Sequence, residues 1–222
     1  IQPSQPKRLL RRSRLRTTTE VDALIVGGGL VGGVLALALA GSGLAVAVVD
    51  TESPAHAKNT RAPNHRTDGR VSAIAVSSKR LLENIGVWAA LAPAAQPIEH
   101  IRVAEAGTPH FLHYDAREVG GEPFGFMVEN RTLRRELGRG ISDLDGIALF
   151  APARIATLER GLFGVEATLA DGRRIRGSLA IAADGAASRT RTDAGIGVAR
   201  LGYGQTAIVC AVRHERAHES IA

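Results

Sequence analysis

The chain has 222 residues, enough for one large or two small domains with a sizeable core. Its single cysteine, Cys210, excludes an internal disulfide framework, and no apolar run reaches the ~20 residues that a membrane-spanning helix needs. The net charge of +6 comes from residues 1–16, which carry six basic side chains and no acid. The remaining 22 basic residues match the 22 acidic ones, so we expect no nucleic-acid-binding surface on the folded part.

Residues 1–20 form a basic tail without the apolar periodicity of a packed element, and we expect this tail to be disordered. Three explanations of it stay open. It resembles an organellar transit segment in being Arg-rich and acid-poor, it could contact anionic lipid or nucleic acid, or it could be translated upstream sequence.

The segment 21–50 carries the strongest signal in the chain. An apolar run at residues 23–26 predicts a buried strand, and residues 30–40 predict a helix of small residues. A second apolar run at residues 44–49 predicts another strand, which ends in Asp50. The segment therefore predicts a strand, a helix and a parallel strand, the unit that binds dinucleotides.

Gly27, Gly29 and Gly32 form a G-x-G-x-x-G motif between the first strand and the helix, and Asp50 follows 18 residues after Gly32. In such a motif the first glycine permits a tight turn and the second lets the backbone approach a pyrophosphate. The third glycine lets the helix lie close to the sheet, and the acid accepts hydrogen bonds from a ribose. The free N–H groups at the helix N-terminus favour the phosphates. This segment alone does not distinguish NAD from FAD.

The middle of the chain predicts a mixture of helices and short strands after a polar loop at residues 51–69. Helices are predicted over residues 72–85 and 131–141. Strands are predicted over residues 98–103, 111–114 and 124–128, and several more over 147–183 with turns at residues 171–172 and 176–177.

A second acidic strand end follows at Asp184 and Gly185, after an apolar run at residues 179–183. Ser188 is placed to cap the next helix. Ligands of open α/β sheets bind at the carboxyl ends of the strands, so an Asp-Gly pair there is a candidate binding motif. A bare Asp-Gly pair is more often only a turn.

These blocks together resemble the N-terminal half of a class A flavoprotein monooxygenase of the para-hydroxybenzoate hydroxylase fold. Within that group the chain is most similar to the ubiquinone-biosynthesis hydroxylases. The blocks that carry the resemblance occur in the family's order. They are the glycine motif ending at Asp50, Asp68-Gly69-Arg70, Val128-Glu129-Asn130-Arg131, and Ala183-Asp184-Gly185 with Ser188 and Arg191.

The resemblance implies an α/β fold, with a Rossmann-like FAD-binding domain and the start of a β-rich substrate domain. Residues 1–20 would be the tail, and residues 21–200 an incomplete FAD-binding domain with interleaved strands near 98–128. Residues 201–222 would begin the substrate domain. Because the resemblance covers only about half of such an enzyme, we expect a fragment or a truncated product, without substrate-stimulated NAD(P)H oxidation of its own.

The resemblance also implies the residues that bind the cofactor. Gly27, Gly29 and Gly32 would hold the FAD pyrophosphate, and Asp50 the adenosine ribose, where the family usually has Glu. Arg70 would face the flavin and the phosphates, with a solvated arginine as the alternative. Asn130 would approach the cofactor, with a role as helix N-cap as the alternative. Asp184 and Gly185 match the family motif associated with FAD and the nicotinamide donor.

The implied activity is hydroxylation of an aromatic ring, with a polyprenylphenol of ubiquinone biosynthesis as the expected substrate. NAD(P)H would reduce the flavin, and O2 would supply the oxygen atom. Because the cofactor performs this chemistry, no catalytic side chain is predicted. A prenylated substrate favours peripheral contact with the inner membrane face and membership of a multi-enzyme assembly. We therefore expect the protein in the cytoplasm or on the inner membrane face, and we favour both locations over the mitochondrial matrix.

Other assignments stay open beside this one. Another FAD or NAD oxidoreductase, such as a reductase, would share segment 21–50, and an inactive nucleotide-binding fragment would share it too. His214-Glu215-Arg216-Ala217-His218 is a literal H-E-x-x-H zinc motif, but no helical pattern surrounds it. We expect His110 and His113 to be exposed residues rather than ligands, and we predict no metal site.

Overall fold

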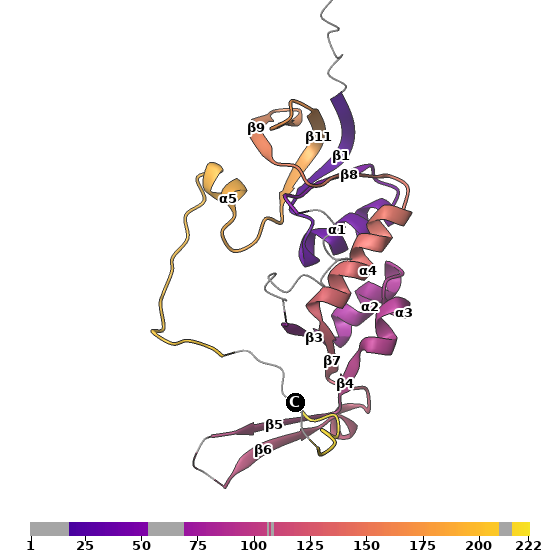
Figure 1. The fold of residues 1–222 in the computed structure, drawn as a ribbon, viewed down its shortest axis with the longest axis vertical. Helices are drawn as coiled ribbons and strands as arrows, with labels where there is room; N and C mark the ends of the chain where they lie inside the picture. Colours follow the sequence, from indigo (N-terminus) through magenta and orange to yellow (C-terminus); the bar gives the residue numbers. More distant parts are fainter. Residues whose placement is uncertain (1–17, 53–68, 106, 108, 209–214) are drawn as a thin grey trace, which may run out of the picture.

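The structure, a computed structural model, describes residues 18–52, 69–105, 107, 109–208 and 215–222. Its main sheet has six strands in the order β8-β2-β1-β11-β10-β9 (Figure 1). The first four are parallel to one another, and the last two are antiparallel. These strands are β1 (Thr18–Val26), β2 (Val46–Val49), β8 (Ile147–Phe150), β9 (Ile155–Gly161), β10 (Gly164–Leu169) and β11 (Arg174–Ala182). The apolar runs predicted for β1 and β2 are central strands, with Leu24, Ile25, Val46 and Val48 fully buried.

Two helices, α1 (Leu30–Gly41) and α4 (Asn130–Asp143), pack against each other beside this sheet (Figure 1). Leu37 of α1 belongs to the same buried cluster as Leu133, Leu137 and Ile141 of α4. The i, i+4, i+8 spacing of these three residues therefore marks the buried side of α4, as the sequence predicts.

A second sheet, in the order β3-β7-β4, continues from the N-terminal end of α4. It consists of β3 (Val71–Ala75), β7 (Gly125–Glu129) and β4 (Gln96–Ile98), all antiparallel. Helices α2 (Val76–Asn84) and α3 (Trp88–Leu91), followed by the short helix η2 (Ala92–Ala94), lie beside it. Trp88 packs edge-on against Phe126 of β7, with ring centroids 5.1 Å apart, which ties α3 to this sheet.

A hairpin of β5 (His100–Ala104) and β6 (Phe111–Asp115) projects from one end of the molecule (Figure 1). The short helix η3 (Ala116–Val119) follows it. At the other end, α5 (Arg189–Asp193) precedes an extended segment that runs toward the hairpin (Figure 1). The last residues pair with β5: His100 forms a parallel bridge with Ile221, and Arg102 N donates to Ala222 O at 2.8 Å.

Most of the predicted elements are confirmed. The strand predicted over residues 98–103 is divided between β4, which ends at Ile98, and β5, which begins at His100 in another sheet. Two further predictions are wrong. Residues 72–75 belong to strand β3 rather than to a helix, because they pair with β7, and the helix begins only at Val76. Residues 176–177 lie inside β11 and pair with β10 instead of forming a turn. The predicted tail also ends earlier than expected, since Thr18–Glu20 is part of β1. Residues 1–17, most of the polar loop, Cys210 and His214 lie outside the described residues.

Among the helices that the structure describes, none combines the length and the apolar character needed to cross a bilayer.

Candidate functional site

Three parallel strands end side by side at one edge of the main sheet. β1 lies between β2 and β11, with Val26 paired to Val49 on one side and to Ala182 on the other. The residues that follow these strands are therefore brought together. They are the glycine motif, Asp50 and the Asp184-Gly185 pair, which are six of the predicted cofactor residues.

Gly27 and Gly32 are required by the packing of the protein itself. Gly27 has φ +102°, and a Cβ there would collide with the Ala183 carbonyl and the Asp184 backbone. A Cβ on Gly32 would collide with the carbonyl oxygen of Gly27. The first and third glycines thus let the turn close against β11 and let α1 approach the turn.

Gly29 differs from both, because a Cβ there would meet no atom within 4 Å. It is also the N-cap residue of α1, with φ −67° and ψ −163°, values open to any residue. Packing and backbone conformation therefore give no reason for glycine at this position. Close approach of a ligand to the backbone does give one, so the loop fits a pyrophosphate.

The N-terminus of α1 faces the same edge with its amide groups uncapped. Gly29 has no side chain to accept from them, and the first turn contains no acidic residue. The first hydrogen bond within the helix runs from Gly33 N to Gly29 O at 2.8 Å. The N–H groups of the first turn, from Leu30 to Gly32, are therefore placed to bind an anion.

Asp50 is held against the glycine loop. Its Oδ2 accepts from Gly28 N at 2.5 Å, and its Oδ1 accepts from Glu52 N at 2.7 Å. Each carboxylate oxygen keeps a further lone pair, so these contacts still allow hydrogen bonds from a ribose. Asp50 therefore fixes the loop as well as being positioned to bind a sugar.

Asp184 organises the turn that follows β11. Its Oδ1 accepts from the Ser188 hydroxyl at 2.5 Å, and its Oδ2 accepts from Thr190 N at 3.0 Å. Burial alone would raise the pKa of Asp184, but the hydrogen bonds from Ser188 and Thr190 outweigh burial and lower that pKa. Ser188 caps α5 as predicted, accepting from Arg191 N at 3.0 Å. Gly185 follows with φ +82°, which favours glycine there.

Arg70 and Asn130 form a second group, where β3, β7 and α4 meet. Asn130 N donates to the Arg70 carbonyl at 3.1 Å, and Asn130 Oδ1 accepts from the Ser72 hydroxyl at 2.6 Å. The N-cap residue of α4 is Glu129, so the alternative N-cap role of Asn130 is wrong. The contact of Ser72 with Asn130 was missed by the sequence prediction, because Ser72 was assigned to a helix rather than to strand β3.

The two groups are connected through the helix pair. A Cβ on Gly33, near the start of α1, would come within 3.5 Å of Leu137 Cβ on α4. That distance is an ordinary van der Waals contact, so α4, which begins at Asn130, packs directly against the helix that begins at the glycine motif.

The H-E-x-x-H motif does not form the helical zinc site. Glu215–His218, the described part of the motif, is not helical, and His218 Nδ1 accepts from Ser220 N at 3.1 Å. The helix that would place two histidines on one face is therefore missing from this part of the chain.

Comparison with known proteins identifies relatives of most of the chain. The family described as FAD binding domain matches residues 20–214. Ubiquinone hydroxylase UbiL of Rhodospirillum rubrum is 51% identical over 201 residues, which are 90% of this chain and 46% of that protein. The 3-demethoxyubiquinol 3-hydroxylase of Escherichia coli is 37% identical over 90% of this chain and 50% of its own length. The chain thus spans about half the length of the curated relatives it matches.

A solved structure shares the fold. Pseudomonas aeruginosa PqsL in complex with 2-aminobenzoylacetate aligns with a TM-score of 0.69 and 24% identity, covering 83% of this chain and 48% of that one. At this identity the similarity shows the fold alone. That fold is the one that the sequence predicts for this chain, the fold of flavoprotein monooxygenases.

Proposed function

Because the chain belongs to the FAD binding domain family, we propose that the edge formed by β1, β2 and β11 binds FAD. Gly29 and the N-terminus of α1 would hold the pyrophosphate, and Asp50 the adenosine ribose. Gly27 and Gly32 would shape the loop. Gly29 carries this proposal, since the packing of the protein gives no reason for glycine at that position.

The remaining predicted residues would act around the bound cofactor. The backbone of Asp184 and Gly185 would form one wall of the pocket, with the Asp184 carboxylate ordering the turn through Ser188 and Thr190. Arg70 would offer charge to the phosphates or the flavin. Asn130, fixed by Ser72, would support Arg70 through the backbone hydrogen bond between them.

FAD held at this edge would supply the chemistry of an NAD(P)H-dependent monooxygenase, in which O2 provides the oxygen atom for hydroxylation of an aromatic ring. We propose a prenylated phenol of ubiquinone biosynthesis as the substrate, on the strength of the two ubiquinone-pathway relatives. The residues of this chain would bind and orient the cofactor and exclude water from part of it. A prenylated substrate would also favour peripheral membrane contact and membership of an assembly with other enzymes of the pathway.

A matched pair of glycine variants tests FAD binding. Neither Gly29 nor Gly41 would bring an added Cβ within 4 Å of another atom, so Gly29→Ala and Gly41→Ala should both fold. We expect Gly29→Ala to weaken FAD binding by about tenfold or more, because the added methyl group would keep the phosphates from the backbone; a tenfold change corresponds to about 1.4 kcal/mol. Gly41→Ala should bind like the original chain. Quenching of flavin fluorescence on titration measures both, and equal affinities for the two variants would contradict the site.

A chimera tests the hydroxylase proposal separately. The 201 matching residues of R. rubrum UbiL would be replaced by those of this chain. We expect the chimera to hydroxylate a polyprenylphenol, detected as gain of one oxygen atom by mass spectrometry, and to lose this activity with Gly29→Ala. A folded chimera that binds FAD and oxidises NADH or NADPH but hydroxylates no such phenol would contradict the substrate class while leaving the cofactor site standing.

A further inference from the structure

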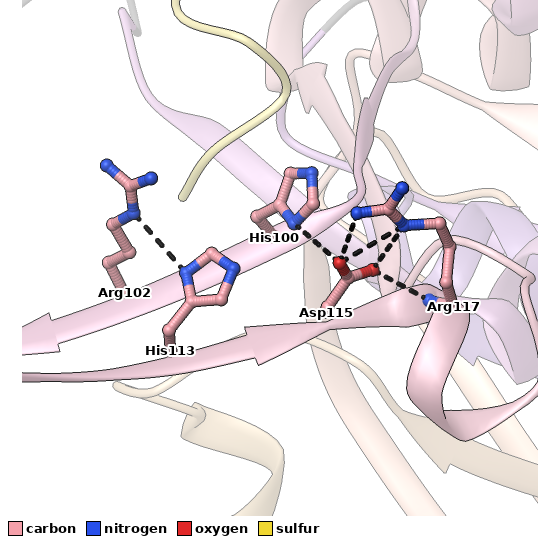
Figure 2. Close-up of polar contacts among 5 residues, drawn as sticks. All are labelled: His100, Arg102, His113, Asp115 and Arg117. Carbon is pink, nitrogen blue, oxygen red and sulfur yellow. Dashed lines mark hydrogen bonds and ion pairs between the residues drawn. The ribbon is translucent and has the colours of Figure 1, made fainter.

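One face of the β5–β6 hairpin gathers three side chains that can ligate a metal. His100 of β5 is paired directly with Asp115 of β6, and His113 lies two residues before Asp115 in the same strand. Alternate residues of a strand point to the same face, so all three side chains project together. Figure 2 shows His100, His113 and Asp115 on the same side of the hairpin.

The distances among these side chains are close to those of a metal site. One ligand atom from each lies within 4.8 Å of the other two. In a tetrahedral zinc site with bonds of about 2.1 Å, neighbouring ligand atoms are about 3.4 Å apart. Contraction by about 1.4 Å or less would therefore complete the three ligands, and His113 is exposed and can move. Two histidines and a carboxylate with an open fourth position form a known type of zinc ligand set.

His100 contributes an unusual feature to this group. Its Nδ1 is buried and makes no hydrogen bond in the described part of the chain. Asp115 Oδ2 lies 3.8 Å away, close enough for the ion pair drawn in Figure 2 when His100 is protonated but beyond hydrogen-bond distance. Buried polar atoms are nearly always paired, so this nitrogen needs an explanation. A cation between it and the Asp115 carboxylate would pair both.

Two arginines compete with a cation for the same ligands (Figure 2). Arg117 donates from Nη2 to Asp115 Oδ2 at 2.6 Å, and its Nε donates to Asp115 Oδ1 at 3.0 Å. Arg102 Nε donates to His113 Nδ1 at 3.3 Å. The Arg117 side chain is 81% exposed and can turn into solvent, while Asp115 stays largely buried with 9% of its surface exposed. The arginines would therefore weaken metal binding without blocking it.

We propose that His100, His113 and Asp115 bind a divalent cation of the zinc type, with water in the fourth position, in competition with Arg117 and Arg102. This site is separate from the glycine loop and does not depend on the proposed flavin chemistry.

Calorimetric titration of the full chain with Zn²⁺ tests this proposal. We expect one Zn²⁺ per chain and at least about tenfold weaker binding in His113→Ala, since even outer-shell partners of a metal are worth that much. Arg117→Gln removes the competing charge but keeps the backbone N–H that Asp115 accepts, and should bind Zn²⁺ more tightly than the original chain. His110→Ala, a histidine of the same hairpin region outside the group, should bind like the original chain.

Circular dichroism spectra of all variants would establish that they are folded. Equal zinc affinity in His113→Ala and His110→Ala would overturn the proposal, as would absence of binding both in the original chain and in Arg117→Gln. Binding that depends on His218 but not on His113 would assign the metal to the H-E-x-x-H segment and overturn it as well.

Discussion

Gly29 and Gly32 belong to one motif, yet the protein needs them for different reasons. A Cβ on Gly32 would overlap the carbonyl of Gly27, whereas a Cβ on Gly29 would meet open space. Folding therefore explains glycine at position 32, whereas at position 29 the proposed FAD binding is left to explain it. The sequence motif requires glycine at both positions, and only the packing around each position shows that the reasons differ.

Gly32→Ala should destabilise the fold. Because the colliding atom is backbone, neither the helix nor the turn can yield cheaply, and we expect a loss of about 1–3 kcal/mol in the free energy of unfolding, the usual cost of overpacking. Urea denaturation followed by circular dichroism measures this loss. Gly41→Ala serves as the control, because its Cβ has room. Equal unfolding midpoints for the two variants would contradict the close contact between α1 and the turn.

Asp184 should make stability depend on pH. The pKa of Asp184 in the folded protein lies below the ordinary value. Its contribution to the free energy of unfolding is therefore fully present above a pH of about 4 and is lost as the pH falls through the folded pKa. Asp184→Asn should lower the free energy of unfolding at pH 7 by about 1.5–3 kcal/mol, the range for hydrogen bonds to a charged group. Urea unfolding at pH 7 and at about pH 3 would show this difference shrinking in acid. A gap that stays constant would mean that the charge contributes nothing.

Sequence alone predicts the glycine motif and Asp50, because strand, glycines, helix and acid follow one another in a single segment. It also predicts the Ser188 cap, since capping depends on neighbours along the chain. The bond from the Ser72 hydroxyl to Asn130 could not be predicted, because it joins residues from distant parts of the chain. It depends on the pairing of β3 with β7, which local patterns do not specify.

At the level of elements, the two wrong predictions share a physical cause. Residues 71–75 alternate between more and less exposed side chains, with Ser72 and Ile74 on the buried side, and this period of two indicates a strand. Because the helix Val76–Asn84 follows directly, its helical pattern was extended back over these strand residues in the sequence prediction. Gly177 was assigned to a turn because glycine often marks one, but it pairs with Val165 of β10 inside the sheet. The close approach of β10 there depends on Gly164, where a Cβ would collide with the Gly177 carbonyl. Tertiary pairing overrode the local preference in both cases.

Packing of α1 on α4 should depend on Leu37, which is 3% exposed and lies against Gly140 of α4. Leu37→Ala should lower the free energy of unfolding by about 2–5 kcal/mol, the range for cavities left by buried leucines. Val31→Ala is the control on the same helix, because Val31 is 74% exposed and should change stability by no more than about 0.5 kcal/mol. Chemical denaturation of the two variants measures the change. Similar losses of unfolding free energy in both would contradict the assignment of Leu37 to the buried side of α1.

At the scale of the whole molecule, the net positive charge belongs to residues 1–16 and not to the folded part of the chain. A variant starting at Thr17 loses all six basic residues of the tail, which lowers the net charge from +6 to zero. We expect it to pass through a cation-exchange column at pH 7 and low salt that retains the original chain, while FAD affinity stays the same. Retention of the shortened variant would reveal a basic patch on the folded part.

The pairing of β1 with β11 also sets an order of events during synthesis. Thr18 pairs with Arg174 and Val26 with Ala182, so the first described strand and the last strand of the sheet are neighbours. A ribosome releases β1 and β2 early, but one edge of β1 stays open until β11 has emerged. The backbone at Ala183 that closes against Gly27 arrives later still. Contacts between such distant segments form slowly. The glycine loop is therefore synthesised early, and the proposed nucleotide pocket can be completed only after the backbone at Ala183 has been synthesised.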